Sequence, residues 1–136
     1  MLPFAISIKP GESPYRQVVY AATKAILSGE LASGSAFPSV RELSSELKIN
    51  PNTAQKVVAE LTRDRLLEVR PGIGTVVAAV SGRRAPATDR KALLSADVEA
   101  LVVEAKRLGL RRDEVVDAIG ATWDDLFGDG AKDTAR

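Results

Sequence analysis

Residues 38–77 constrain the fold of this 136-residue chain more than any other segment. Ser39 and Glu42 have the spacing of a capping box, in which each side chain binds a backbone N–H group at the start of a helix. Asn50 and Pro51 then provide an N-cap and a first-turn proline, which begin a second helix. The segment therefore predicts two short helices that are separated by a tight break.

Two β-prone runs follow these helices, at residues 66–70 and 75–79. The turn between them contains Gly72 and Gly74, and glycine readily adopts the positive φ angles that tight hairpin turns require. Two helices followed by a short hairpin are the order of a winged helix-turn-helix. We expect a mainly α fold with a small β wing, in which residues 1–79 form a DNA-binding domain.

The predicted helix over residues 51–64 has two different faces. At the helical period of about 100° per residue, its apolar side chains fall within one arc. That arc holds Ala54, Val57, Val58 and Leu61. The opposite arc holds Asn52, Gln55, Lys56, Ala59 and Arg63. Such a helix is suited to packing on a core with one face and entering a DNA groove with the other.

The residues before the winged segment predict one strand and one helix. Apolar residues alternate with smaller ones over residues 4–8, which is the period of a strand. A helix over residues 14–28 follows, with Ser13 as its N-cap and Gly29 as its C-terminal stop.

The residues after the wing predict a linker and a helical extension. Residues 80–90 are small, polar and proline-containing, which is typical of a linker. In the extension, residues 91–136, apolar residues recur at a spacing that forms a seam for another helix. The seam residues are Leu94, Val98, Leu101, Ala105 and Leu108. A last helix is expected over residues 113–127, followed by a frayed end.

The seam has two interpretations. It contacts a second copy of the chain, or it packs within the chain against the last helix or the first. We favour the homodimer because the predicted DNA-binding face carries few basic residues, so that useful affinity requires two copies. A two-fold dimer implies an inverted-repeat operator with half-sites about one helical turn apart.

The composition argues against most catalytic and metal chemistry. The chain contains no cysteine and no histidine, which removes thiolate ligands, the commonest metal ligand and the commonest general base. We therefore expect no catalytic residue, no metal site and no cofactor. Neither a signal peptide nor a membrane span is evident, so the expected location is the cytoplasm. The net charge of +1 does not by itself indicate a nucleic-acid partner, and the DNA hypothesis rests on residue placement.

Several short motifs together resemble the DNA-binding domain of the GntR family of bacterial transcription regulators. They are Pro14-Tyr15-Arg16-Gln17, Gly29-Glu30-Leu31, Pro38-Ser39-Val40-Arg41-Glu42-Leu43, Asn50-Pro51-Asn52-Thr53 and Gly72-Ile73-Gly74-Thr75. The Asn-Pro-Asn-Thr step and the short C-terminal part are similar to the YtrA-like subfamily. That resemblance implies a small helical dimerisation unit, and control of a nearby transporter operon.

The candidate DNA-binding residues lie on the two helices and the wing. The set is Arg41, Asn52, Thr53, Gln55, Lys56, Arg63, Arg70, Gly72 and Gly74. Asparagine and glutamine suit adenine edges, and lysine suits guanine or a phosphate. The resemblance implies that Arg41 contacts phosphate. The alternatives are an ordinary hydrated surface for the polar residues, a capping role for Thr53 and turn geometry alone for the glycines.

The chain departs from the family pattern at several positions. Lys48 and Arg65 stand where the family usually has glycine, so both positions are expected to need left-handed backbone. Gln55 and Lys56 replace commoner residues of the second helix, and Ile73 occupies a wing-tip position that is often basic. These departures predict an operator that differs from those of relatives.

The predicted function is that of a sequence-specific transcriptional regulator, which represses by occluding its operator. The main alternative is a winged-helix module that binds another protein. We do not expect an enzyme, because the chain ends too early for the aminotransferase-like domain that some relatives carry after the same head. A small-molecule effector is allowed but not indicated, and Trp123 and Phe127 are expected to pack rather than to bind a ligand.

Overall fold

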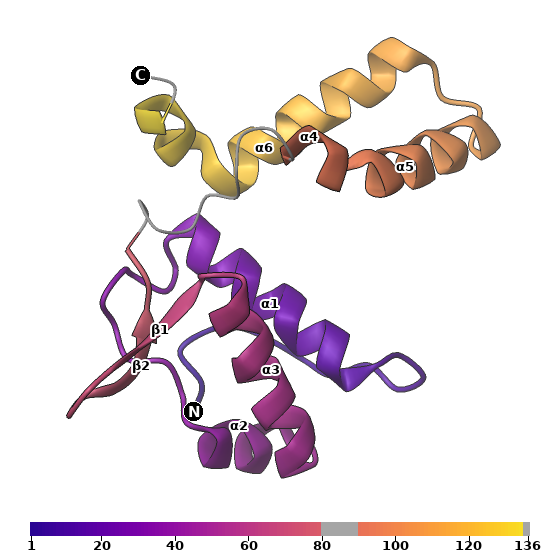
Figure 1. Ribbon diagram of the computed structural model, residues 1–136. Coiled ribbons are helices and arrows are strands. Elements are labelled where there is room, and N and C mark those ends of the chain that lie inside the picture. Colours follow the sequence, from indigo (N-terminus) through magenta and orange to yellow (C-terminus); the bar gives the residue numbers. More distant parts are fainter. Residues whose placement is uncertain (80–89, 135–136) are drawn as a thin grey trace. The chain divides into compact units, whose positions relative to one another are not determined.

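The structure, a computed structural model, describes residues 1–79 and 90–134 (Figure 1). The chain forms two compact units, Met1–Arg84 and Ala85–Arg136. Apart from Arg90, the predicted linker lies outside the described residues. No helix of the described residues is long and apolar enough to span a membrane.

The first helix, α1 (Pro14–Ser28), begins and ends at the predicted residues. The Ser13 side chain accepts a hydrogen bond from the Arg16 N–H group at 3.3 Å, which satisfies one of the free donors of the first turn. Gly29 ends the helix with a φ of 87°, in the left-handed region that glycine adopts without a steric penalty.

The capping box of α2 (Val40–Leu47) is confirmed in both directions. The Glu42 carboxylate accepts from the Ser39 N–H group at 3.0 Å, and the Ser39 hydroxyl accepts from the Glu42 N–H group at 3.1 Å. Helix α3 (Pro51–Arg63) then begins at an Asn50 cap, whose side-chain oxygen accepts from the Asn52 N–H group at 2.7 Å. The sequence therefore determines locally where both helices begin.

Lys48 and Arg65 adopt left-handed backbone, as their positions predicted. Their φ angles are 56° and 64°, and they are the two non-glycine residues with positive φ among the described residues. This conformation brings the Cβ of an L-residue close to its own backbone, and it costs roughly 1–2 kcal/mol per residue. A long basic side chain thus follows each of α2 and α3 at a position where glycine fits best: Lys48 after α2 and Arg65 after α3.

The wing is an antiparallel hairpin of β1 (Leu67–Arg70) and β2 (Gly74–Val77). Gly72 and Gly74 have φ angles of 79° and 112°, which explains why the turn needs glycine at both positions. The segment before α2 attaches the hairpin to the helices, because Ala36 bridges Val76. The wing is therefore held in place at its base, and its tip projects (Figure 1).

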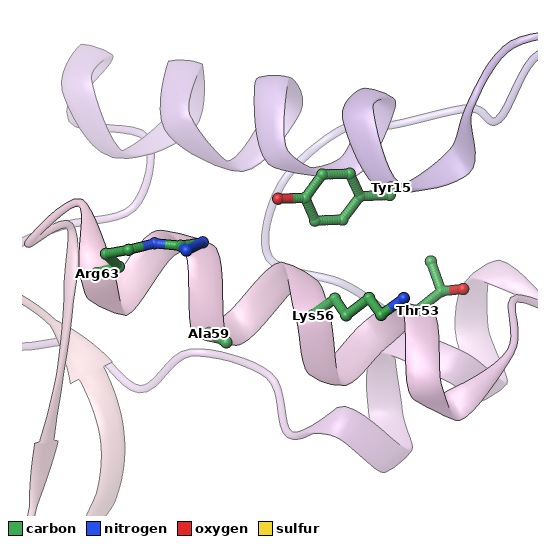
Figure 2. Close-up of a pocket in the computed structure, with 5 residues that line it drawn as sticks. All are labelled: Tyr15, Thr53, Lys56, Ala59 and Arg63. Atoms are coloured by element: carbon green, nitrogen blue, oxygen red, sulfur yellow. The ribbon is translucent and has the colours of Figure 1, made fainter.

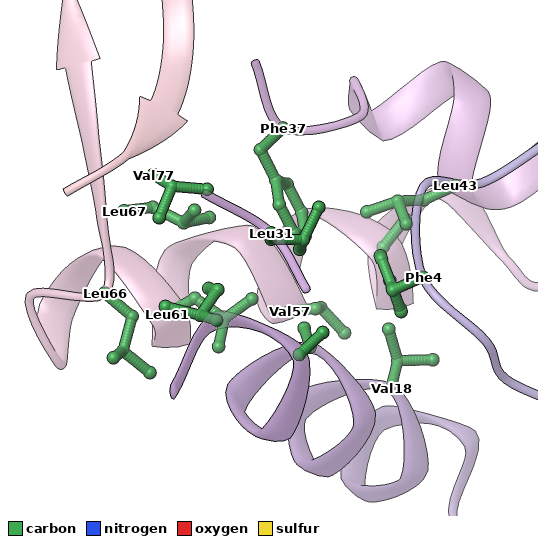
Figure 3. Packing of buried hydrophobic residues seen from close by; sticks show 14 residues of the cluster. Phe4, Val18, Leu31, Phe37, Leu43, Val57, Leu61, Leu66, Leu67 and Val77 are labelled. Atoms are coloured by element: carbon green, nitrogen blue, oxygen red, sulfur yellow. The ribbon is translucent and has the colours of Figure 1, made fainter. Parts of the chain in front are cut away.

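One hydrophobic core unites the helices and the base of the wing (Figure 3). Its buried members include Val18, Ile26, Leu31, Phe37, Leu43, Val57, Leu61, Leu66, Leu67 and Val77. Helix α3 lies in the middle of this arrangement, since it contacts α1, α2 and β1. The core thus fixes the orientation of α3 relative to α2 and the wing.

The predicted strand over residues 4–8 is wrong. That segment forms no β-ladder in the structure, and the N–H group of Ala5 donates to the Glu30 side chain at 3.3 Å instead. Phe4 is buried and stacks on Phe37 with the ring centroids 5.9 Å apart. The alternation of apolar residues therefore reflects packing against the helical core, which a period of two alone does not distinguish from a strand.

The C-terminal unit is built from α4 (Arg90–Leu93), α5 (Ser95–Arg107) and α6 (Arg112–Thr134). Gly109, with a φ of 78°, lies in the turn between α5 and α6. The predicted end of the last helix at Phe127 coincides with a break, because Phe127 has a non-helical φ of −133°. Helical residues continue beyond this break to Thr134, where a frayed end was expected, and Gly120 does not interrupt the helix.

Candidate nucleic-acid interface

Helix α3 has the two faces that its sequence predicts. Ala54, Val57 and Leu61 are completely buried in the core, with an exposed fraction of 0% each. The polar face is open to solvent through Asn52, Gln55, Lys56, Ala59 and Arg63. A row of amide and cationic side chains thus stands on the outer side of a helix whose inner side is fixed.

Helices α2 and α3 pack against each other, and each carries a candidate DNA-binding residue in its first turn, Arg41 in α2 and Thr53 in α3. Thr53 is partly buried, whereas Arg41 in α2 is exposed. Within the described part of the chain, neither Arg41 nor Lys56 forms an ion pair. Their charges are therefore available to an anionic partner.

The wing tip is apolar rather than basic. Ile73 and Val69 are 70% and 66% exposed, and the two turn glycines are exposed as well. Arg70 lies at the end of β1, where its guanidinium Nε is 3.7 Å from a carboxylate oxygen of Glu68. The Arg70 guanidinium at the wing thus forms an ion pair with Glu68.

A cleft of about 450 Å³ lies on the polar side of α3, against α1 (Figure 2). Its lining residues are Tyr15, Thr53, Lys56, Ala59 and Arg63. Three of them, Thr53, Lys56 and Arg63, belong to the set of candidate DNA-binding residues. Tyr15 comes from α1, and the sequence analysis gave it no role beyond its place in a family motif.

Glu60 contacts two residues that line this cleft, and its role was not predicted from the sequence. Its Oε1 atom accepts a hydrogen bond from the Tyr15 hydroxyl at 3.0 Å and forms an ion pair with Arg63. The hydrogen bond from Tyr15, together with the charge of Arg63, lowers the pKa of the Glu60 carboxyl. Burial, and then the nearby Glu60 carboxylate, raise the pKa of the Tyr15 hydroxyl. At neutral pH Glu60 is therefore a charged acceptor inside a basic surface.

The predicted seam on α5 is covered at one position and open at four. Ala105 is buried within the chain, with an exposed fraction of 6%, whereas Leu94, Val98, Leu101 and Leu108 are 42–57% exposed. Helices α5 and α6 line an apolar cleft of about 370 Å³, to which α6 contributes Val115, Ala118, Ile119, Trp123 and Leu126. Within it, the Trp123 and Phe127 rings meet edge to face with centroids 5.8 Å apart. Packing within the chain thus accounts for Ala105, and the rest of the seam remains exposed.

Comparisons with known proteins agree with this fold. The sequence model for bacterial regulatory proteins of the gntR family matches residues 14–77. An uncharacterised HTH-type transcriptional regulator of Bacillus subtilis, YhcF, is 38% identical over 92 residues, which are 66% of this chain and 73% of that protein. The HTH-type transcriptional repressor YtrA of the same organism is 27% identical over 112 residues, 81% of this chain and 85% of that protein.

Solved structures share the architecture of most of the chain. A transcriptional antiterminator from Listeria monocytogenes EGD-e superposes with a TM-score of 0.74 at 24% identity, covering 90% of this chain and 91% of that chain. YtrA from Sulfolobus acidocaldarius, a GntR-family transcription factor, superposes with a TM-score of 0.51 at 24% identity, covering 89% and 98%. At this level of identity the likeness shows the fold, which is a winged helix followed by helices.

Proposed function

The chain belongs to the GntR family of bacterial regulatory proteins, which are DNA-binding transcriptional regulators, and from this premise we propose that it is a repressor that binds an inverted-repeat operator as a homodimer. The observation that carries the proposal is the outer face of α3, where Asn52, Gln55 and Lys56 are exposed on a helix fixed by its buried face. The repressor role is supported by the name of the relative YtrA.

In this proposal the first turns of α3 enter the major groove. Gln55 and Asn52 present amides that match adenine N6 and N7, and Lys56 matches guanine or a phosphate. Thr53 supports the same turn or contacts the backbone. Docking of this kind is the usual geometry of helix-turn-helix proteins.

The remaining candidates position the protein on the phosphate backbone. Arg41 contacts phosphate from α2 and Arg70 contacts it from the end of β1, whereas Arg63 at the end of α3 reaches phosphate only in competition with its ion pair to Glu60. Gly72 and Gly74 leave the wing tip slender enough to approach the DNA closely. Contacts of this class fix register and orientation, whereas the base edges supply sequence preference.

Dimerisation through the C-terminal unit supplies the second recognition helix. The exposed seam residues Leu94, Val98, Leu101 and Leu108 lie on α5 and at its two ends, and Leu101 and Leu108 also line the apolar cleft between α5 and α6. A second copy of the unit is the occupant that we assign, because a two-fold interface pairs the same apolar surface with itself. Of the candidate DNA-contacting cations, only Arg41 and Lys56 have no ion pair within the described residues, so a single copy binds DNA weakly.

The proposal is tested by selecting bound duplexes from a random DNA library and by mobility shifts on the DNA upstream of the gene. We expect a salt-sensitive shift and a selected inverted repeat whose half-sites lie about one helical turn apart. Sedimentation of the free protein should show a dimer. Absence of any sequence preference would instead favour the alternative, a winged-helix module that docks another protein, and a monomer on a single half-site would contradict the dimer.

A further inference from the structure

Glu60 is an acid next to the cations Lys56 and Arg63 of α3, and a second acid, Asp64, lies beside it at the end of the helix. Glu60 precedes Arg63 by three residues on α3 and contacts two residues that line the cleft, Tyr15 and Arg63. A carboxylate at such a place repels phosphate, so its presence requires a reason other than DNA contact.

Two donors meet at the same oxygen of Glu60. The Tyr15 hydroxyl reaches Oε1 from α1, across 45 residues of sequence, and the Arg63 guanidinium reaches it from the next turn of α3. The Glu60 side chain is 27% exposed and that of Arg63 is 68% exposed. Tyr15 therefore holds a partly buried carboxylate in one position, and that carboxylate holds a largely exposed cation.

We propose that Glu60 is a positioning residue that limits DNA affinity: anchored by Tyr15, it keeps Arg63 paired with the protein and away from the phosphate backbone. This inference rests on the proposed function, since it concerns the strength of the same interface. A phosphate that recruits Arg63 must first replace the Glu60 carboxylate, so Arg63 contributes less than an unpaired cation does.

The neighbouring cations provide an internal comparison. Lys56 lines the same cleft and has no ion pair among the described residues. Arg70 on the wing is 3.7 Å from Glu68. Within the described part of the chain, no side chain of another helix or strand donates a hydrogen bond to Glu68 as Tyr15 does to Glu60. The anchored pair is thus specific to α3, the helix that carries the candidate base-reading residues.

The first test measures affinity and its salt dependence for the Glu60→Gln variant, using a random-sequence duplex and the duplex selected by the wild-type protein. The amide oxygen still accepts from Tyr15, so the link between α1 and α3 is retained, while the negative charge is lost. We expect binding to tighten by roughly 2–5-fold, because Arg63 is released from its partner. The slope of log affinity against log salt should steepen by about 0.9, which corresponds to one more neutralised phosphate.

The matched control is Glu99→Gln, which removes the same charge from an exposed position of α5 that has no ion pair within the described residues. A second variant, Arg63→Gln, is made alone and together with Glu60→Gln. Alone it should weaken binding less than the matched change Lys56→Gln does, because Lys56 has no ion pair in the described part of the chain, whereas in the Glu60→Gln background Arg63→Gln should abolish the gain. This coupling is the signature of the pair, and thermal unfolding verifies that each variant is folded.

The inference is overturned if Glu60→Gln binds no better than Glu99→Gln, or if it binds more weakly, which would mean that Glu60 directs Arg63 towards the DNA. Either result leaves the proposed function intact as long as the wild-type protein selects an operator. Failure of the wild-type protein to prefer any sequence would overturn the proposed function itself.

Discussion

The two units of the chain bury their apolar residues to very different extents. In the described residues, every buried apolar side chain except Ala105 belongs to the N-terminal unit. The C-terminal unit instead leaves many large apolar residues exposed, among them Leu94, Leu101, Leu108, Ile119 and Trp123. One unit has a complete core, whereas the other has an apolar surface that its own helices do not cover.

This difference indicates a division of labour. The N-terminal unit is stabilised by contacts within one chain, so its stability should not depend on protein concentration. A helical unit whose apolar surface is covered by a second copy is stabilised by association, and its apparent stability rises with concentration. In the proposed dimer, base reading depends on the N-terminal unit and affinity depends on association of the C-terminal unit.

The largest expected effect is that of Leu101→Asp, which places a charge in the exposed seam. It should prevent dimerisation and lower operator affinity by roughly 10²–10⁴-fold, because the second recognition helix no longer binds in the same complex. Light scattering and mobility shifts measure the two losses. A dimer that persists in this variant would refute the assignment of the seam.

A smaller but still large effect is expected for Leu61→Ala in the core. Leu61 has an exposed fraction of 0%, so truncation should lower the free energy of unfolding of the N-terminal unit by about 2–5 kcal/mol. Urea denaturation measures the change. The control is Leu93→Ala, since Leu93 is 66% exposed and its truncation should change stability by less than about 0.5 kcal/mol. Equal losses for the two variants would remove the contrast between the units.

Gln55→Ala tests base reading without changing the buried core or the seam residues. It should lower affinity for the operator by about 1–3 kcal/mol at particular base pairs, because an amide that binds adenine is lost. Affinity for random-sequence DNA serves as the control and should stay the same. Leu101→Asp should weaken binding to all sequences, so a uniform loss for Gln55→Ala would contradict a base contact.

The smallest effect is a gain of stability from Lys48→Gly. Because Lys48 has a φ of 56°, glycine relieves the steric conflict and should stabilise the N-terminal unit by about 0.5–1 kcal/mol. Lys24→Gly, an exposed position inside α1, is the matched control and should destabilise by about 1 kcal/mol. Thermal unfolding should show both shifts in the transition of the N-terminal unit alone, and a loss for Lys48→Gly would be the opposite of what the backbone predicts.

Features that depend on a few adjacent residues were predictable from the sequence. The caps at Ser13, Ser39 and Asn50 were found because each satisfies backbone donors within three residues of itself. The left-handed positions Lys48 and Arg65 were found through the family resemblance, because the family usually has glycine there. The caps follow from local stereochemistry, whereas the left-handed positions needed the comparison with a family pattern.

Features that depend on tertiary contact were not predictable. The segment around Phe4 has the period of a strand but packs on Phe37 without a ladder. The bond between Tyr15 and Glu60 joins residues 45 positions apart, and no spacing rule connects them. Ala105 shares the period of the exposed seam, yet its own chain covers it. The periodicity of apolar residues predicts which face of an element a side chain lies on. It does not predict which distant residues that side chain contacts.

The position of Trp123 gives the molecule a built-in optical probe. It is the chain's single tryptophan and lies in the α5–α6 cleft, whereas both tyrosines, Tyr15 and Tyr20, lie on α1. Indole absorbs at longer wavelengths than phenol, so selective excitation reports on the C-terminal unit alone. Emission therefore tests the proposed association of C-terminal units in the unlabelled protein, and a labelled duplex in the same cuvette measures DNA binding separately.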